Sequence, residues 1–100
     1  MDDILTLIGE MYTQDDIGQF VARETQTGVW AHITNVTRSE WAAAGQNGLA
    51  PSYVATTNAF NYSGEKMAAW KGKRYSIYRT YIQSDSDNIE LYLEEQSGAL

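Results

Sequence analysis

Short runs of β-branched and aromatic residues recur along this chain, and each run is bounded by residues that favour turns. The first run is Ile4–Ile8, and a turn cluster at Gln14–Gly18 separates it from a second run at Phe20–Glu24. After a turn expected at Thr25–Gly28, Val29–Val36 alternates apolar and polar residues with the period of a half-buried strand. The first third of the chain is therefore predicted to form three short strands.

The second half of the chain repeats this pattern. The expected strands are Tyr53–Tyr62, Met67–Trp70, Arg74–Ile82 and Ile89–Glu95, with turns at Ser63–Glu65, Lys71–Gly72 and Ser84–Asn88. In the last strand Ile89, Leu91 and Leu93 fall on one side, which predicts one buried face and one face in water. Seven short strands separated by regular turns predict a mainly all-β fold, a small antiparallel barrel or sandwich.

One short helix is expected between the two halves. Thr37 and Glu40 have the spacing of a capping box, in which each side chain binds the backbone N–H of the other residue. This predicts a helix over Thr37–Ala44 that ends near Gly45. The following stretch, Gly45–Ser52, contains the only proline and is expected to be a long flexible loop.

Composition limits the class of protein. One hundred residues, of which 43% are hydrophobic, predict a single folded domain over residues 1–100 with a frayed tail at 96–100. Cysteine is absent, which excludes disulfides and thiolate chemistry within the chain. The first residues include two acids instead of a basic signal region, and the apolar runs are too short to span a bilayer. We therefore expect a cytoplasmic site of synthesis and no membrane contact.

The residue types and spacings needed for catalysis are missing. The single histidine, His32, has no cysteine with which to form a metal cluster, and it is expected on a strand surface. Neighbouring acids such as Asp15 and Asp16 suit a solvated turn, and the glycines occur singly instead of in a phosphate-binding loop. The sequence predicts no enzymatic activity, no cofactor and no metal.

Charge is unevenly distributed along the chain, which has a net charge of −6. Residues 66–84 contain five basic and no acidic residues, whereas residues 85–100 contain five acidic and no basic residues. Two interpretations remain open. The basic stretch is either a strand that forms salt bridges with its acidic neighbours or one of two oppositely charged docking faces.

A long ordered series of motifs resembles a known family. It includes NYSGEKMAAWKGKRYSIYRTYIQSDSDNIELYLEE at residues 61–95 and, upstream, DDIG, VWAHI and TRSEWAAAG. With these motifs the chain, from about Ile4 to Glu95, resembles the head-tail adaptor or head-completion (stopper, head closure) proteins of long-tailed bacteriophages and prophages of Gram-positive bacteria. The resemblance implies a small β-barrel with a short helix and a long loop.

The resemblance also implies a place in the virion. Such a protein is made in the bacterial host cytoplasm, is monomeric alone, and assembles as a homo-oligomeric ring at the head-tail junction after DNA packaging. The ring lies below the portal or connector adaptor protein, extends the channel and offers a docking surface to the tail or tail-completion protein. Double-stranded DNA passes through without sequence-specific binding, which suits an acidic chain.

Two sets of residues follow from the resemblance. By position, a channel-gating loop corresponds to about residues 39–53, although a spacer without a gate also fits the family. The gating residues are Ser39, Ala44, Gly45, Gln46, Asn47, Gly48, Leu49, Pro51 and Tyr53. A basic strand expected to contact a neighbouring subunit contains Lys71, Lys73, Arg74 and Arg79.

A second function fits the same basic strand. Its sequence, WKGKRYSIYRTY, interleaves cations with aromatic rings, as in surfaces that neutralise phosphates and stack on bases. In this alternative the chain is a β-barrel that binds single-stranded nucleic acid. The stacking residues would be Trp70, Tyr75, Tyr78 and Tyr81, and the same four cations would follow the nucleic-acid backbone.

Overall fold

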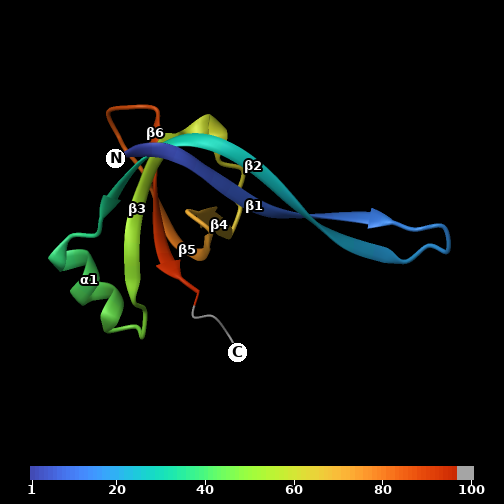
Figure 1. Ribbon diagram of the computed structural model, residues 1–100, viewed down its shortest axis with the longest axis horizontal. Coiled ribbons are helices and arrows are strands. Elements are labelled where there is room, and N and C mark those ends of the chain that lie inside the picture. The colour runs from blue at the N-terminus through green and yellow to red at the C-terminus, as the bar shows by residue number, and fades with distance from the viewer. Residues whose placement is uncertain (97–100) are drawn as a thin grey trace.

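The protein is a closed barrel of six antiparallel strands with one short helix, described here from a computed structural model over residues 1–96. Around the barrel the strands follow the order β1-β2-β3-β6-β5-β4. The elements are β1 (Asp2–Gln14), β2 (Phe20–Asn35), α1 (Arg38–Gly45), β3 (Pro51–Asn58), β4 (Met67–Trp70), β5 (Lys73–Ile82) and β6 (Asn88–Glu95) (Figure 1). The mainly all-β antiparallel fold with one short helix is confirmed.

The core fills the inside of the barrel. Leu5 and Leu7 of β1 and Leu91 and Leu93 of β6 are its largest fully buried side chains. The predicted alternation is confirmed in β2 and β6, because Val29, Ala31, Ile33 and Ile89 are buried beside them. Ala55, Ala68, Trp70 and Tyr75 complete the core from the other strands. The barrel interior is therefore a packed hydrophobic core.

The first two strands are much longer than expected. β1 continues past Gly9, and β2 is a single strand in which the stretch Thr25–Gly28, expected to be a turn, is paired throughout with β1. Gly9 and Gly28 do not form turns but allow side chains of the paired strand to pack closely against the backbone. A Cβ at Gly9 would lie 2.9 Å from Thr25 Oγ1, and one at Gly28 would lie 3.3 Å from Ile4 Cγ2. The prediction of seven strands was wrong because two of them are one strand.

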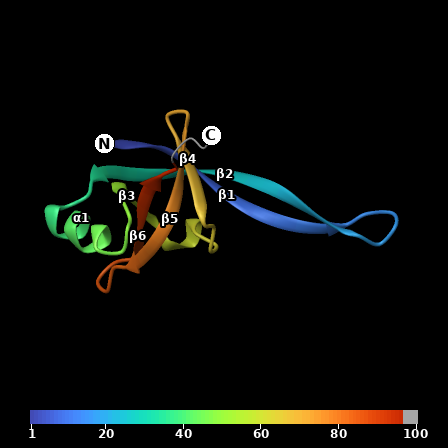
Figure 2. The ribbon, with the colours of Figure 1, turned by 90° about the horizontal axis from the view of Figure 1, so that it is seen from below.

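The distal half of this hairpin leaves the barrel. β1 pairs with β4 only over Thr6–Ile8, and β2 pairs with β3 only from His32 onward. Residues 9–25, which we call the arm, therefore pair with no third strand of the sheet. Figures 1 and 2 show the arm projecting far to one side of the barrel, in a molecule 51 Å long.

The shorter turns of the second half lie closer to the positions expected from the sequence. Lys71 and Gly72 form the expected two-residue turn, with φ angles of 51° and 78°, as a tight hairpin turn requires. The strand expected to reach Tyr62 ends at Asn58 and is followed by a short 3-10 turn at Ala59–Asn61. β5 contains an irregularity between Ile77 and Arg79, where Tyr78 is an extra residue opposite β6.

The C-terminal end is paired up to the last described residue. The Gln96 N–H donates to Arg74 O at 3.0 Å, so this first residue of the expected frayed tail extends the strand pairing. The rest of that tail, residues 97–100, lies outside the described residues. Within residues 1–96, no helix has the length and apolar character needed to cross a membrane.

Candidate assembly surfaces

The basic strand makes ion pairs within the chain. Arg74 donates two hydrogen bonds to Glu24, at 2.8 and 3.1 Å, which joins β5 to the base of the arm. Lys73 Nζ lies 3.4 Å from Glu95 Oε1, and Lys71 Nζ lies 4.8 Å from the centre of the Trp70 ring. The interpretation of the charge pattern as a strand paired with acidic neighbours is therefore supported for Lys73 and Arg74.

The aromatic residues of the same stretch divide between core and surface. Trp70 and Tyr75 are 7% and 2% exposed, and the edge of the Tyr53 ring packs between them, with ring centres 5.0 and 6.0 Å away. Trp70 Nε1 also donates to Asp3 Oδ2 at 3.0 Å. Tyr81, in contrast, is half exposed. Two of the four rings proposed to stack on bases are therefore unavailable for stacking in the folded protein.

A carboxylate from α1 joins the helix to the barrel wall. Glu40 accepts a hydrogen bond of 2.7 Å from Tyr78 Oη, one of 3.2 Å from Arg79 Nε, and another from Arg79 Nη2. The irregularity in β5 lets two consecutive residues reach the same carboxylate, and Arg79 also lies 3.8 Å from the Tyr92 ring centre. Only half of the predicted capping box forms. Thr37 Oγ1 accepts the Glu40 N–H, but the Glu40 side chain turns to β5 instead.

This cluster shifts the acidity of its members. The hydrogen bond from Arg79, and then that from Tyr78, lowers the pKa of Glu40 against the opposing effect of burial. Burial, followed by the hydrogen bond to Glu40, raises the pKa of the Tyr78 phenol. Burial and a hydrogen bond to Glu90 raise the pKa of Tyr92 to about 12. The carboxylate and both phenols therefore hold their ordinary charge states across the neutral range.

We expect Glu40→Ala to lower the free energy of unfolding by about 1–2 kcal/mol at pH 7, because three hydrogen bonds to a mostly buried carboxylate are lost. Since the pKa of Glu40 is lower in the folded state than its ordinary 4.5, this stabilisation is complete above pH 4.5. It is lost as the pH falls through the folded-state pKa. Thermal unfolding at several pH values tests both points.

Glu24→Ala is the matched control, since it removes an exposed carboxylate that also binds an arginine. Its effect on the melting temperature should be clearly smaller, as is usual for surface ion pairs. Equal effects for the two variants, or a Glu40 effect that persists unchanged at pH 3, would contradict the assigned role of Glu40.

The predicted gating residues lie in three consecutive segments. Ser39, Ala44 and Gly45 belong to α1, Pro51 and Tyr53 belong to β3, and the actual connection is only Gln46–Ala50. The expected long loop is therefore much shorter, because β3 begins at Pro51, which is buried. The left-handed residue after the helix is Gly48, with φ 77°, and not Gly45.

Hydrogen bonds hold both ends of this connection. The Leu49 N–H donates to Ala44 O at 3.1 Å, and the Ala50 N–H donates to Glu94 Oε2 at 2.6 Å. The connection is thus a closed turn between the end of α1 and the start of β3. Its first three residues, Gln46–Gly48, are exposed.

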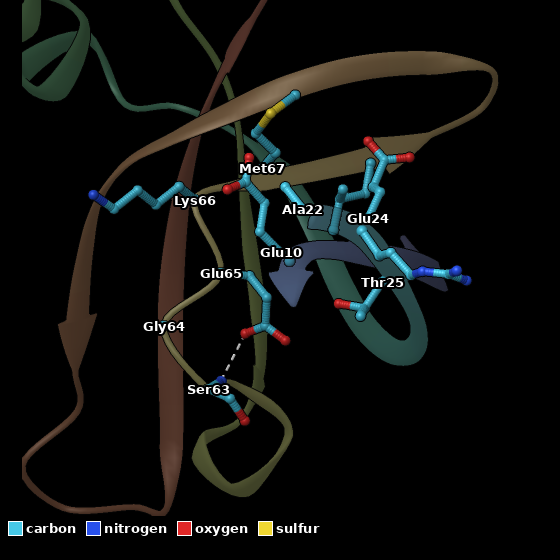
Figure 3. Close-up of a pocket in the computed structure, with 12 residues that line it drawn as sticks. Glu10, Ala22, Glu24, Thr25, Ser63, Gly64, Glu65, Lys66 and Met67 are labelled. Carbon is cyan, nitrogen blue, oxygen red and sulfur yellow. Dashed lines mark hydrogen bonds between the residues drawn. The ribbon is translucent and has the colours of Figure 1, made fainter. Parts of the chain in front are cut away.

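A groove of about 660 Å³ lies at the base of the arm. Figure 3 shows Glu10, Glu24 and Thr25 of the arm facing the segment Ser63–Met67 across it. Glu65 accepts the Ser63 N–H at 2.7 Å, and Glu24 is bound by Arg74. Both of these carboxylates are therefore already bound within the chain, and Arg23 and Lys66 also line the groove, which is an open surface of mixed charge beside the arm.

The arm has exposed apolar side chains on both faces. The pairing register places Met11 and Val21 on the face that continues the barrel interior, and Tyr12 and Phe20 on the opposite face. Phe20 is 75% exposed, and Ile17 at the tip is 78% exposed. The tip itself is ordered, because Asp15 Oδ1 accepts the N–H groups of Ile17 and Gln19. Sequence reasoning missed this surface because it divided the arm between short strands.

His32 lies on the outer surface of β2, as expected, with Nδ1 2.6 Å from Asp2 Oδ1. Among residues 1–96, no group of three or more histidine or acidic side chains is arranged to hold a metal ion. No protein-family model matches the chain, and the search of curated proteins finds no match.

Proposed function

We propose that this chain is a structural protein of the head-tail connector of a tailed bacteriophage. In this proposal its copies form a ring below the portal or adaptor after DNA packaging, extend the DNA channel and provide a surface on which the tail docks. The proposal rests on the resemblance of residues 61–95 and the upstream motifs to head-completion proteins.

The projecting arm is the observation that best supports this proposal. A two-stranded ribbon is at best marginally stable alone, and this one exposes large apolar side chains on both faces and at its tip. Contact with another protein would remove these side chains from water. A component that functions when assembled would present such a surface to its partner.

The charges also favour the connector over the single-stranded nucleic-acid-binding alternative. Arg74 and Arg79 are each bound by a carboxylate of the same chain, and Trp70 and Tyr75 are buried. Phosphates would have to compete with those carboxylates, in a chain with a net charge of −6. A channel wall that lets DNA slide past is well served by such a weakly binding surface.

Within the ring, the Gln46–Ala50 connection is the proposed gate. It follows the end of the helix, its first three residues are exposed, and Gly48 has a left-handed backbone conformation. Glu40 holds the preceding helix to β5, so a movement of the gate with α1 would first have to break the contacts with Tyr78 and Arg79.

Nuclease protection of packaged DNA tests this function. DNA-filled, tail-less capsids of the cognate phage that lack this protein are incubated with the purified chain, and the surviving genome is measured. We expect retention to require the chain. Deleting Asn47 and Gly48 should abolish retention without abolishing binding to the capsid vertex, whereas deleting Asp85 and Ser86 from the β5–β6 turn should leave both unchanged.

Three other outcomes have distinct meanings. Vertex binding without any change in retention would make the protein a spacer. Retention that survives the deletion of Asn47 and Gly48 would remove the gate from this connection. No vertex binding would contradict the connector proposal, and quenching of tryptophan fluorescence by oligonucleotides would then support the nucleic-acid alternative.

A further inference from the structure

The exposed turn after α1 contains the only asparagine of the chain that is followed by a glycine. A glycine has no Cβ to shield its backbone nitrogen, so the side chain of the preceding asparagine can reach that nitrogen. Asparagine is also one of the chemically labile residues of proteins. The sequence therefore singles out Asn47, which precedes Gly48, for a reaction within the chain. The other asparagines all precede residues with side chains: Asn35, Asn58, Asn61 and Asn88.

The structure leaves the Asn47 side chain unrestrained. Asn58 Oδ1 accepts the Phe60 N–H at 2.9 Å, and Asn61 Nδ2 donates to Thr57 Oγ1 at 3.0 Å. Among residues 1–96 no such hydrogen bond holds the side chain of Asn47, which is exposed. Asn58 and Asn61 are therefore internal controls in the same folded chain.

The backbone nitrogen of Gly48 is restrained only within the turn. Its N–H donates to Gly45 O at 3.1 Å, while the next amide, of Leu49, donates to Ala44 O. Gly48 has φ 77°, and a Cβ built there would meet no atom within 4 Å, so the space around it is open. Exposed backbone hydrogen bonds of this kind open locally without unfolding the rest of a protein. Opening one bond thus frees the nitrogen for reaction.

We propose that Asn47 is a site of spontaneous deamidation. The backbone nitrogen of Gly48 bonds to Cγ of Asn47, the bond from Cγ to Nδ2 breaks, and the proton lost from the nitrogen leaves with the released ammonia. The product is a cyclic succinimide. Water, the only co-reactant, then opens the ring. Attack at Cγ yields aspartate, and attack at the main-chain carbonyl carbon yields isoaspartate, whose main chain passes through the former side chain.

Either product changes the end of α1. The reaction adds one negative charge to a chain with a net charge of −6, directly after the helix C-terminus. A carboxylate is unfavourable there because of the helix dipole, and the last turn of α1 contains no basic residue to compensate. Isoaspartate also lengthens the main chain inside the turn. We therefore expect the turn to loosen. This chemistry does not depend on the proposed function, although it would alter the proposed gate.

Peptide mapping by mass spectrometry tests the inference. The purified chain is incubated at pH 7 and at pH 9, and the mass gain caused by deamidation is followed at each asparagine. Isoaspartate is identified by enzymatic methylation with an isoaspartate methyltransferase. Asn47→Gln is the control variant, because the longer glutamine side chain forms the corresponding ring far less readily. Hydrogen exchange of the Leu49 amide is compared between Asn47→Asp and Asn47→Gln.

We expect Asn47 to deamidate at least tenfold faster than Asn58 and Asn61, to react faster at pH 9, and to yield both products. The Leu49 amide should exchange severalfold faster in Asn47→Asp. Equal rates at the three asparagines would overturn the inference. So would an unchanged Asn47 after an incubation that fully converts a synthetic peptide of residues 44–50. Neither result bears on the connector proposal, which the capsid assay tests separately.

Discussion

Replacing Tyr75 by alanine is expected to lower the free energy of unfolding by about 3–5 kcal/mol, a large part of the stability of a domain of this size. The Tyr75 side chain is 2% exposed and packs against the edge of Tyr53 inside the barrel. Its removal leaves a cavity that the surrounding strands cannot fill. Urea unfolding followed by circular dichroism measures the change.

Tyr81→Ala is the matched control in the same strand. Tyr81 is half exposed, so its removal should change the free energy of unfolding by less than about 0.5 kcal/mol. If β5 is instead primarily a nucleic-acid surface, both substitutions should weaken the binding of oligonucleotides, which is measured separately. Similar stability losses for the two variants would show that the core is wrongly placed.

Removing residues 11–23 of the arm is expected to eliminate the proposed function while leaving the barrel folded. Joining Glu10 directly to Glu24 through Asn-Gly closes a cross-strand pair and removes residues 11–23. None of those residues is buried, so the melting temperature should stay within about 4 °C. Genome retention in the capsid assay should fall to the level measured without the protein.

The milder variant Tyr12→Ser with Phe20→Ser tests the same point if the shortened chain folds poorly. Both side chains are exposed, and their loss should reduce retention at least tenfold with an unchanged melting temperature. The double variant Tyr81→Ser with Ile82→Ser, also on exposed positions, is the control. Full retention by the shortened chain would mean that the arm has no part in the proposed ring.

Alternation of apolar residues predicted the barrel core well. Ile89, Leu91 and Leu93 are buried as expected, and the helix begins after Thr37, whose hydroxyl caps it. Local patterns failed where a glycine has a tertiary role. Gly9 and Gly28 look like turn residues in the sequence, but they permit close packing across β1 and β2.

The candidate surfaces were less predictable because they depend on contacts between distant segments. Thr37 and Glu40 correctly indicated a cap, yet nothing local reveals that Glu40 also binds Tyr78 and Arg79. The pairing of Glu24 with Arg74 likewise joins residues fifty positions apart. One signal for the arm was available: Met11 and Tyr12 continue the β-favouring pattern of Ile4–Ile8 without a proline or a charge cluster.

The arm is also continuous with the barrel in a mechanical sense. From Asp2–His32 to Gln14–Phe20 the pairing of β1 with β2 has no shift in register, so no hinge separates the projecting part from the wall (Figure 2). A load applied at the tip is transmitted along two hydrogen-bonded backbones into Leu5 and Val29 of the core. When a load pulls or tilts the arm, the barrel must therefore turn with it, and the protein moves as a single lever.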